Sequence, residues 1–423
     1  MLSEADNERL TRTGPGTPMG ALMRRYWIPA LLSEELPAPD CAPVRVRLLG
    51  ENLVAFRDSD GRAGLMDERC PHRGASLFFG RNEEGGLRCI YHGWKFDVAG
   101  RCLDMPNEPP ERQFKDRLRA RAFPVREAAG VIWAYMGAAE KQPPFTDQEW
   151  MRLPPGHSYV TKNLAECNWL QLLEGGFDES HSSFLHRRMS WSRNEDGTKT
   201  QFYRAQSHAP RHDVVITEFG YSYASIRELP EGRNYVRVVQ FVMPFHQMRS
   251  FEGIQDCPLV SGHIWTPIDD EHCWVWSWMY AKDGRALARA VIEAEERGAG
   301  RSPEFFIPGT YRFRENKAND YLIDRGLQRT SNFTGIDGIA AQDQAAQESM
   351  GPIADRTIEH LGTADIAVIT TRRLLLKACR DIEEGRDPLG SQLESIKVRA
   401  AEKTMTADRP WLEELSNDLV AVA

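Results

Sequence analysis

Two short clusters of cysteine and histidine are the residues of this sequence best suited to chemistry. Cys70 and His72 form the first cluster and Cys89 and His92 the second, with sixteen residues between His72 and Cys89. Each cluster therefore offers one thiolate and one imidazole. Two sulfur and two nitrogen ligands are the ligand set of a Rieske [2Fe–2S] centre, in which the imidazoles raise the reduction potential. The pattern predicts a protein that moves single electrons.

A structural zinc site is the alternative for the same four residues. Zinc sites of the Cys₂His₂ type usually take both cysteines from one turn and both histidines from another, whereas each cluster here mixes the two types. Gly74 and Gly93 would let the backbone come close to bridging sulfides. Trp94 and Phe96 would shield such a site from water. The two-iron interpretation is therefore favoured.

A second pattern, in the stretch EGGFDESHSSFLH, combines carboxylates with two histidines. On a helix, Glu174, Asp178 and His181 would share one stripe. His186 would point away from it, so both imidazoles reach one metal only if the helix ends or widens near residues 182–183. Two histidines and one carboxylate are the ligands of a non-haem iron that activates dioxygen, and the third ligand must come from elsewhere. Without such a metal, both histidines would be ordinary surface or core residues.

Composition limits the function. A chain of 423 residues is long enough for two or three domains, and 41% hydrophobic with 27% charged residues is typical of a soluble protein. The net charge of −8 argues against a nucleic-acid partner. No apolar run is long enough to span a membrane. The acidic start, MLSEADNERL, lacks the features of a secretory signal, and the remaining six cysteines form no disulfide framework, so we expect a cytoplasmic protein.

The patterning predicts an α+β protein with an all-β amino-terminal domain. Short alternating strands split by turns carry the two Cys/His clusters, and a proline-rich stretch at 141–155 is expected to be a linker. Beyond it, alternating segments and amphipathic helices such as 364–383 predict an antiparallel sheet covered by helices, as in a helix-grip fold. The expected divisions are an amino-terminal segment that packs on the catalytic domain, the cluster domain and the catalytic domain, at residues 1–43, 44–140 and 156–423.

The whole chain resembles the oxygenase α subunit of Rieske non-haem iron aromatic-ring-hydroxylating oxygenases, in particular the phthalate 4,5-dioxygenase group. The matching stretches are GPGTPMGALMRRYW, CPHRGASL, CIYHGWKFD, NWLQLLEGGFDESHSSFLH and QDQAAQESMGPIADRTIEHLG. The resemblance implies a [2Fe–2S] cluster on the four residues named first, and a mononuclear Fe(II) on His181, His186 and Asp343. The local sequence alone leaves Asp337 and Glu348 as rivals for the carboxylate ligand.

The resemblance also implies the partners. Asp178 would bridge a cluster histidine of one subunit to His181 of its neighbour in a homotrimer or stacked hexamer. A flavin- and ferredoxin-type reductase would deliver electrons from NAD(P)H, and O₂ would be used to dihydroxylate the ring of an aromatic acid. O-demethylation of a methoxylated, lignin-derived aromatic acid is an alternative with the same metals. A more distant alternative is a Rieske electron carrier that has no catalytic iron.

Two arginines are candidates to hold the carboxylate of such a substrate. Arg237 would share a strand face with apolar residues, where an arginine requires an anionic partner. Arg211 precedes a predicted strand that starts at Val214. For both, an internal ion pair, with Glu218 for example, or exposure at a sheet edge is the alternative.

Overall fold

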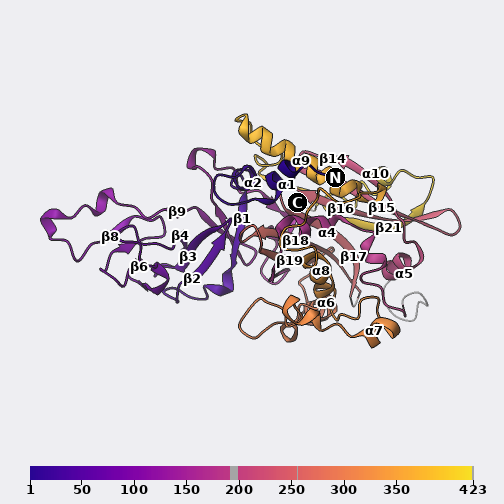
Figure 1. The fold of residues 1–423 in the computed structure, drawn as a ribbon, viewed down its shortest axis with the longest axis horizontal. Coiled ribbons are helices and arrows are strands. Elements are labelled where there is room, and N and C mark those ends of the chain that lie inside the picture. The colour runs from indigo at the N-terminus through magenta and orange to yellow at the C-terminus, as the bar shows by residue number, and fades with distance from the viewer. Residues whose placement is uncertain (191–198, 255, 422–423) are drawn as a thin grey trace. The chain divides into compact units, whose positions relative to one another are not determined.

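The computed structural model describes residues 1–190, 199–254 and 256–421, and the chain divides into two compact units. The smaller unit is Thr13–Pro143, and the larger unit joins Met1–Arg12 to Pro144–Ala423. Figure 1 shows both units, with strands throughout the smaller one and both helices and strands in the larger one. Residues 13–43, expected to pack on the catalytic domain, lie within the smaller unit, where β1 (Trp27–Leu32) pairs with β11 (Val131–Tyr135).

The smaller unit is built from three antiparallel sheets, one short α-helix, α2 (Pro18–Met23), and several turns of 3₁₀ helix. Apolar side chains from two of these sheets form the core beneath the Cys/His clusters. The first sheet has the order β1-β11-β10, with β10 at Val125–Ala128. The other two have the orders β2-β3-β4-β9 and β5-β6-β7-β8, with bounds Val44–Leu48, Glu51–Arg57, Ala63–Asp67, Ala122–Phe123, Arg81–Glu83, Gly86–Arg88, Lys95–Phe96 and Cys102–Asp104.

One eight-stranded antiparallel sheet forms the larger unit's framework. Its order is β13-β19-β18-β17-β16-β15-β14, and β21 also pairs with β16. These strands are β13 (Ser158–Ala165), β14 (Arg211–Ile216), β15 (Gly220–Leu229), β16 (Arg233–Val242), β17 (His246–Ile254), β18 (Cys257–Pro267), β19 (Cys273–Ala281) and β21 (Ala401–Thr406). The predicted fold class, an all-β domain followed by an α+β domain with an antiparallel sheet, is confirmed.

Helices cover this sheet, and three of them meet at the part of the unit that carries the second motif. Helix α4 lies against β18 and contacts both α8 and α9. The helices of the larger unit are α1 (Glu4–Thr11), α3 (Glu149–Arg152), α4 (Trp169–Phe177), α5 (Lys199–Gln206), α6 (Arg289–Ala299), α7 (Arg325–Thr330), α8 (Ile339–Glu348), α9 (Ile366–Glu383) and α10 (Trp411–Glu414). Among the described residues, no helix combines the length and the apolar character needed to cross a membrane.

The stretch 141–155, expected to be a linker, contains the boundary between the two units, but most of it is ordered structure of the larger one. It contains β12 (Asp147–Gln148), which pairs in parallel with β20 (Ser395–Ile396), followed by α3. Trp150 is fully buried and stacks on Trp278 at a ring-centroid distance of 5.1 Å. Burying an aromatic side chain of this size stabilises the fold by about 2–3 kcal/mol. The part of this stretch from Pro144 onward therefore belongs to the larger unit, and Trp150 lies in its core.

Two glycines explain how closely α4 packs. A Cβ atom at Gly175 would overlap the side chain of Gln347 on α8, and one at Gly176 would overlap the indole of Trp265 on β18. Each glycine costs the helix about 1 kcal/mol relative to alanine. The close approach to both neighbours offsets that cost, and it fixes the position of the residues that follow the helix.

A buried ionic network anchors the same helix. Glu174 accepts hydrogen bonds from Arg356 at 2.9 Å and from Arg372 at 2.6 Å, and Arg372 also pairs with Glu359. Burial alone would raise the pKa of Glu174, but the two guanidinium groups outweigh it and hold that pKa below its usual value. The network links α4 to α9 and to the loop that follows α8. Glu174 therefore has a structural role.

Candidate functional site

The two Cys/His clusters of the smaller unit form loops with the same hydrogen-bonding pattern. The N–H of Cys70 donates to the carbonyl of Ala75, and the N–H of Gly74 donates to the carbonyl of Cys70, each at 2.8 Å. In the second loop, the N–H of Cys89 donates to the carbonyl of Trp94 at 2.8 Å, and the N–H of Gly93 donates to the carbonyl of Cys89 at 3.0 Å. Both loop glycines have positive φ, 76° for Gly74 and 79° for Gly93, a conformation that other residues rarely adopt.

These loops bring the four predicted ligands together. The imidazoles of His72 and His92 lie 4.5 Å apart between ring centroids, and His72 stacks on Trp94 at 4.2 Å. Cys70 and Cys89 are buried, whereas both histidines are half-buried. Burial, together with the neighbouring Cys89, raises the pKa of Cys70 to about 11. Two adjacent buried thiols lose their protons only beside a strong positive charge, which fits a metal cluster.

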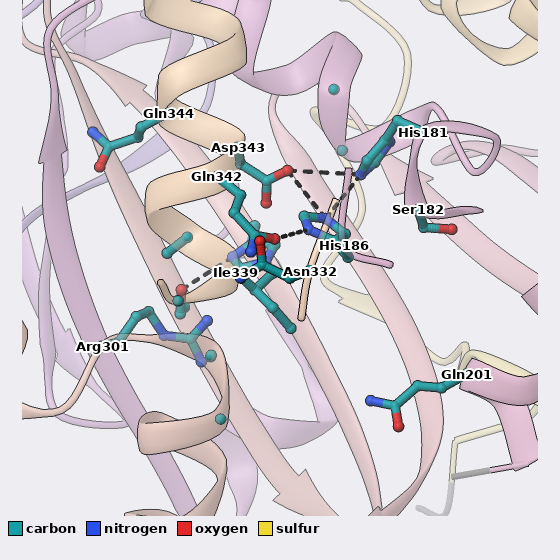
Figure 2. Close-up of a pocket in the computed structure, with 18 of the residues that line it drawn as sticks. His181, Ser182, His186, Gln201, Arg301, Asn332, Ile339, Gln342, Asp343 and Gln344 are labelled. Atoms are coloured by element: carbon teal, nitrogen blue, oxygen red, sulfur yellow. Dashed lines mark hydrogen bonds and ion pairs between the residues drawn. The ribbon is translucent and has the colours of Figure 1, made fainter. Parts of the chain in front are cut away.

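In the larger unit, His181, His186 and Asp343 converge on one point, as Figure 2 shows. The two Nε2 atoms lie 3.2 Å apart, and Oδ1 of Asp343 lies 3.6 Å from Nε2 of His181 and 3.2 Å from Nε2 of His186. Ligand atoms about 2.1 Å from one ion and at right angles to each other are about 3 Å apart. The donor set and its spacing therefore fit a mononuclear iron.

The backbone after α4 makes this convergence possible. The helix ends at Phe177, and Asp178 has an extended conformation. Its Oδ1 accepts hydrogen bonds from the N–H of Ser180 at 2.8 Å and from that of His181 at 3.2 Å, which holds the turn that leads into the short 3₁₀ helix His181–Ser183. The predicted break in the helix exists, but it lies at Asp178 and not near residues 182–183. Asp178 therefore shares no helical stripe with Glu174.

Helix α8 supplies the carboxylate. Asp343 lies in its first half, and its pKa is below the usual value because the imidazoles of His186 and His181 outweigh the opposing effect of burial. The rival acids lie elsewhere. Glu348 accepts hydrogen bonds from the N–H of Glu166 and from the hydroxyl of Tyr321. Asp337 caps its own turn by accepting from the N–H of Gly338, and neither acid joins the histidine cluster.

These three residues lie in the wall of a cavity of about 1030 Å³ within the larger unit. Its volume is at the upper end of the range usual for small-molecule sites. Polar side chains lie on the face of β17 and β18 that is turned toward the cavity. In the register of these two strands, Gln247 lies opposite His263 and Arg249 lies opposite Ser261. Apolar side chains from several elements also contribute to the lining, among them Leu172, Trp265, Val275, Leu327 and Ile339. A cavity of this kind suits an aromatic ring that carries a polar group.

Neither of the two arginines predicted to hold a substrate carboxylate has surroundings that suit this role. Arg211 is exposed on the edge strand β14 and does not line the cavity. Arg237 does line it, but its Nη1 donates to Oε1 of Glu179 at 2.9 Å and both side chains are buried. The same carboxylate lies 3.6 Å from Arg204. Arg237 therefore takes part in an internal ion pair, which was the alternative considered for it.

Arg249 is a cavity residue that the sequence patterns did not single out. Its Nε donates to the hydroxyl of Ser261 at 3.3 Å, and burial, followed by the charge of Arg301, lowers its pKa. No ion pair joins Arg249 to a carboxylate within residues 1–190, 199–254 and 256–421. Across the strand pair, His263 shares a hydrogen bond of 3.0 Å with Ser277, and burial keeps its pKa well below the usual value. Alternation along β17, which places residues 247 and 249 on one face, was the signal available in the sequence.

Comparison with known families agrees with this arrangement. Residues 26–122 match the model of the Rieske [2Fe-2S] domain, and residues 134–415 match the model described as LigXa C-terminal domain like. The second match alone covers more than half of the chain. The chain belongs to the Rieske oxygenase family. It is an oxygenase α subunit, and the cofactors of such an enzyme are a Rieske [2Fe–2S] cluster and a mononuclear non-haem iron.

Curated relatives span nearly the whole Rieske oxygenase chain. The oxygenase subunit of 3-chlorobenzoate-3,4-dioxygenase from Comamonas testosteroni is 42% identical over 89% of this chain and 88% of its own. The oxygenase subunit of phthalate 4,5-dioxygenase from Pseudomonas putida is 37% identical over 94% and 91%. The oxygenase subunit of 5,5'-dehydrodivanillate O-demethylase from Sphingobium sp. is 32% identical over 92% and 83%.

Solved structures support the fold. Dicamba monooxygenase bound to dicamba superposes with a TM-score of 0.59 at 18% identity, covering 86% of this chain and 99% of the other. The enzyme NdmA of Pseudomonas putida CBB5, in its caffeine-bound QL mutant, superposes with a TM-score of 0.62 at 18% identity over 92% and 98%. At 18% identity, these similarities support the fold alone.

Proposed function

We propose that this Rieske oxygenase hydroxylates an aromatic carboxylic acid at an iron held by His181, His186 and Asp343. The convergence of these three side chains in the wall of the cavity is the observation that carries the proposal. When bound, the cluster supplies single electrons and the iron supplies the place where O₂ is reduced. The protein's own part is to bind the acid, orient its ring and exclude water.

The cluster is proposed to bind to Cys70, Cys89, His72 and His92. Their loops have matching backbone geometry and bring both imidazoles together, which supports that assignment. Beside the half-buried histidines, Ile90 and Tyr91 are exposed. An apolar exposed edge at a redox group suits contact with another protein. That contact is proposed to serve both a neighbouring subunit and the electron donor.

Asp178 is proposed to connect the two metal centres between subunits. One of its oxygens, Oδ1, holds the turn that carries His181, while Oδ2 faces Nδ1 of the same imidazole at 3.7 Å. A carboxylate in this position orients a metal-bound imidazole and leaves an oxygen for a second N–H group. The proposal requires a homotrimer or a stacked hexamer, and sedimentation analysis of the purified protein tests it.

The substrate class follows from the cavity. Arg249 is a half-buried cation in the cavity wall, and no ion pair joins it to a carboxylate among the described residues. The negative charge of Glu295 acts on it from nearby, but the positive charge of Arg301 opposes that effect. A charged hydrogen bond to an anionic ligand contributes about 1.5–3 kcal/mol to binding. We propose that the carboxylate of an aromatic acid takes this place. The similarity to enzymes named for chlorobenzoate and phthalate supports the same class.

The remaining partners are also part of the proposal. A reductase of the flavin and ferredoxin type is expected to deliver electrons from NAD(P)H, because the relatives are named as oxygenase subunits, which require a separate donor. Since that donor uses a cytoplasmic coenzyme, the proposed setting is the cytoplasm. O-demethylation of a methoxylated acid is the second candidate reaction, supported by the O-demethylase relative, and it differs only in which carbon lies over the iron.

A turnover screen tests the proposal. The purified protein is supplied with NADH, a general reductase of this type and O₂, and is offered phthalate isomers, halobenzoates and methoxylated aromatic acids. A diol product supports ring dihydroxylation, whereas formaldehyde release supports O-demethylation. Electron transfer without any oxygenated product, from a chain that binds two irons only, would instead support the electron-carrier alternative.

A further inference from the structure

We propose that Gln342 is a positioning residue that fixes the tautomer and orientation of His186 for metal binding. This inference rests on the iron site of the proposed function. Gln342 precedes the ligand Asp343 on α8, and its Oε1 lies 2.9 Å from Nδ1 of His186. Figure 2 shows the amide turned toward the imidazole on the side of α8 that also presents Asp343.

The orientation of the amide is determined by its second contact. Nε2 of Gln342 donates to the carbonyl oxygen of Ile336 at 2.9 Å. A carbonyl oxygen only accepts, so the NH₂ group must face Ile336 and Oε1 must face His186. Because Oε1 also only accepts, Nδ1 of His186 must carry a proton. The neutral imidazole then has its lone pair on Nε2.

That lone pair points to the place where the three ligands meet. Nε2 of His186 lies 3.2 Å from both Oδ1 of Asp343 and Nε2 of His181. Metal-binding histidines are usually oriented by an acceptor on their other nitrogen, and this acceptor also raises their basicity. Through Gln342, the loop at Ile336, the helix α8 and the imidazole of His186 are held as one unit.

The two histidines of the site thus have different partners. His181 faces the carboxylate of Asp178 at 3.7 Å, and its Nδ1 has no hydrogen-bond partner within the described ranges. His186 faces a neutral amide at hydrogen-bond distance. The geometry therefore fixes the orientation of the His186 imidazole. The imidazole of His181 instead faces an acidic side chain, that of Asp178. Gln342 orients His186 without adding a second negative charge beside Asp343.

Gln342 is buried, so its loss has a direct cost. Replacement by methionine keeps the length of the side chain but leaves the Nδ1 N–H of His186 and the carbonyl of Ile336 without their partner. Changes of this kind usually weaken metal affinity by about 10–100-fold. A matched control is Gln344, which is also buried on α8 and donates to the carbonyl of Leu164, but points to the other side of the helix.

The experiment compares Gln342→Met and Gln344→Met with the unaltered protein, each carrying its [2Fe–2S] cluster. Co(II) is titrated into the mononuclear site, and its affinity and visible absorption are measured together with the thermal unfolding temperature. We expect Gln342→Met to weaken Co(II) binding by about 10–100-fold. Gln344→Met is expected to lower the unfolding temperature to a similar extent and to leave Co(II) affinity within about twofold. Equal affinities for the two variants would overturn the inference.

Gln342→Glu keeps the test decisive if the methionine variant fails to fold. Its carboxylate accepts the same Nδ1 proton, so Co(II) affinity is expected within about tenfold of the unaltered protein. Gln342→Asn, which is too short to reach the imidazole, is expected to bind Co(II) as weakly as the methionine variant. Glutamate and asparagine variants with the same affinity would contradict the inference. If the unaltered protein binds no Co(II) at this site, the proposed function fails before the role of Gln342 is tested.

Discussion

Oδ2 of Asp178 lies 3.7 Å from Nδ1 of His181, while Oδ1 of the same carboxylate is occupied by the backbone of the next turn. Burial alone would raise the pKa of Asp178, but the imidazole of His181, helped by the hydrogen bonds from Ser180, outweighs it and holds that pKa below its usual value, so Asp178 is an anion at neutral pH. One oxygen therefore shapes the loop and the other faces a proposed metal ligand. A single residue thus connects the backbone geometry of the site with its proposed electron transfer.

Asp178→Asn separates these two roles. An asparagine still accepts the hydrogen bonds of the turn through Oδ1, so both metal centres are expected to be retained. The loss of the anion beside His181 is expected to reduce turnover by about 10–100-fold or more. Iron content and the rate at which the prereduced cluster is reoxidised in the presence of substrate are the measurements. A reoxidation rate close to that of the unaltered protein would remove Asp178 from the electron path.

Arg249→Gln tests the carboxylate site. Removing one charged hydrogen bond of about 1.5–3 kcal/mol is expected to raise KM for an aromatic acid by about 10–150-fold. The matched control is Arg211→Gln, because Arg211 is exposed and outside the cavity, and its KM is expected to stay within about twofold. The opposite pattern would contradict the assignment: a raised KM for Arg211→Gln together with an unchanged KM for Arg249→Gln.

Gly176→Ala tests the close packing of α4. The added methyl group would overlap Trp265, which is expected to destabilise the protein by about 1–3 kcal/mol despite the better helix propensity of alanine. Gly298, near the end of α6, has open space at its Cβ position and serves as the control. Gly298→Ala is expected to be neutral or to stabilise by up to about 1 kcal/mol. Urea unfolding measures the stability of both variants. Equal unfolding free energies for Gly176→Ala and Gly298→Ala would disprove the packing argument.

Glu174→Gln tests the buried network at low pH. A carboxyl whose pKa is lower in the folded than in the unfolded chain stabilises the fold above its unfolded pKa, about 4.3. This contribution disappears as the pH falls through the folded pKa. At pH 7 the variant is expected to lose about 3–5 kcal/mol, because two buried arginines lose their anion. The difference in unfolding free energy between Glu174→Gln and the unaltered protein is expected to shrink steadily below pH 4.

An exposed pair provides the control for that experiment. Glu383 binds Arg9 at 2.6 Å at the surface, and Glu383→Gln is expected to change stability by less than about 1 kcal/mol. The difference in unfolding free energy between Glu383→Gln and the unaltered protein is expected to depend little on pH. If Glu174→Gln and Glu383→Gln gave parallel curves of unfolding free energy against pH, the network would not be the source of acid sensitivity.

Local patterns in the sequence predicted the parts of the fold that depend on neighbouring residues. The short strands expected around the Cys/His clusters are present, and the helix expected at 364–383 begins two residues late as α9. The helix break before the histidines was predicted, but its place was not. Asp178 ends α4 earlier because its side chain bonds to the backbone two and three residues ahead, in competition with the helix.

Other features depend on contacts between distant segments. Strand β17 departs from the rule that an inward face is apolar, because its inward face lines a cavity and carries the polar residues Gln247 and Arg249. Arg237 meets its anion in Glu179, 58 residues earlier, which no local pattern reveals. Gln342 acquires its role only when α8 packs beside the loop of His186. Such relationships follow from tertiary packing and are absent from local periodicity.

Analysis of iron and acid-labile sulfide, for the unaltered protein and for Asp343→Ala, tests the central claim most directly. If His181, His186 and Asp343 share one ion, the unaltered chain is expected to hold about three irons and two sulfides. Asp343→Ala is expected to hold about two irons and two sulfides, with an unchanged cluster spectrum. Two irons in the unaltered chain, or three in Asp343→Ala, would contradict the account.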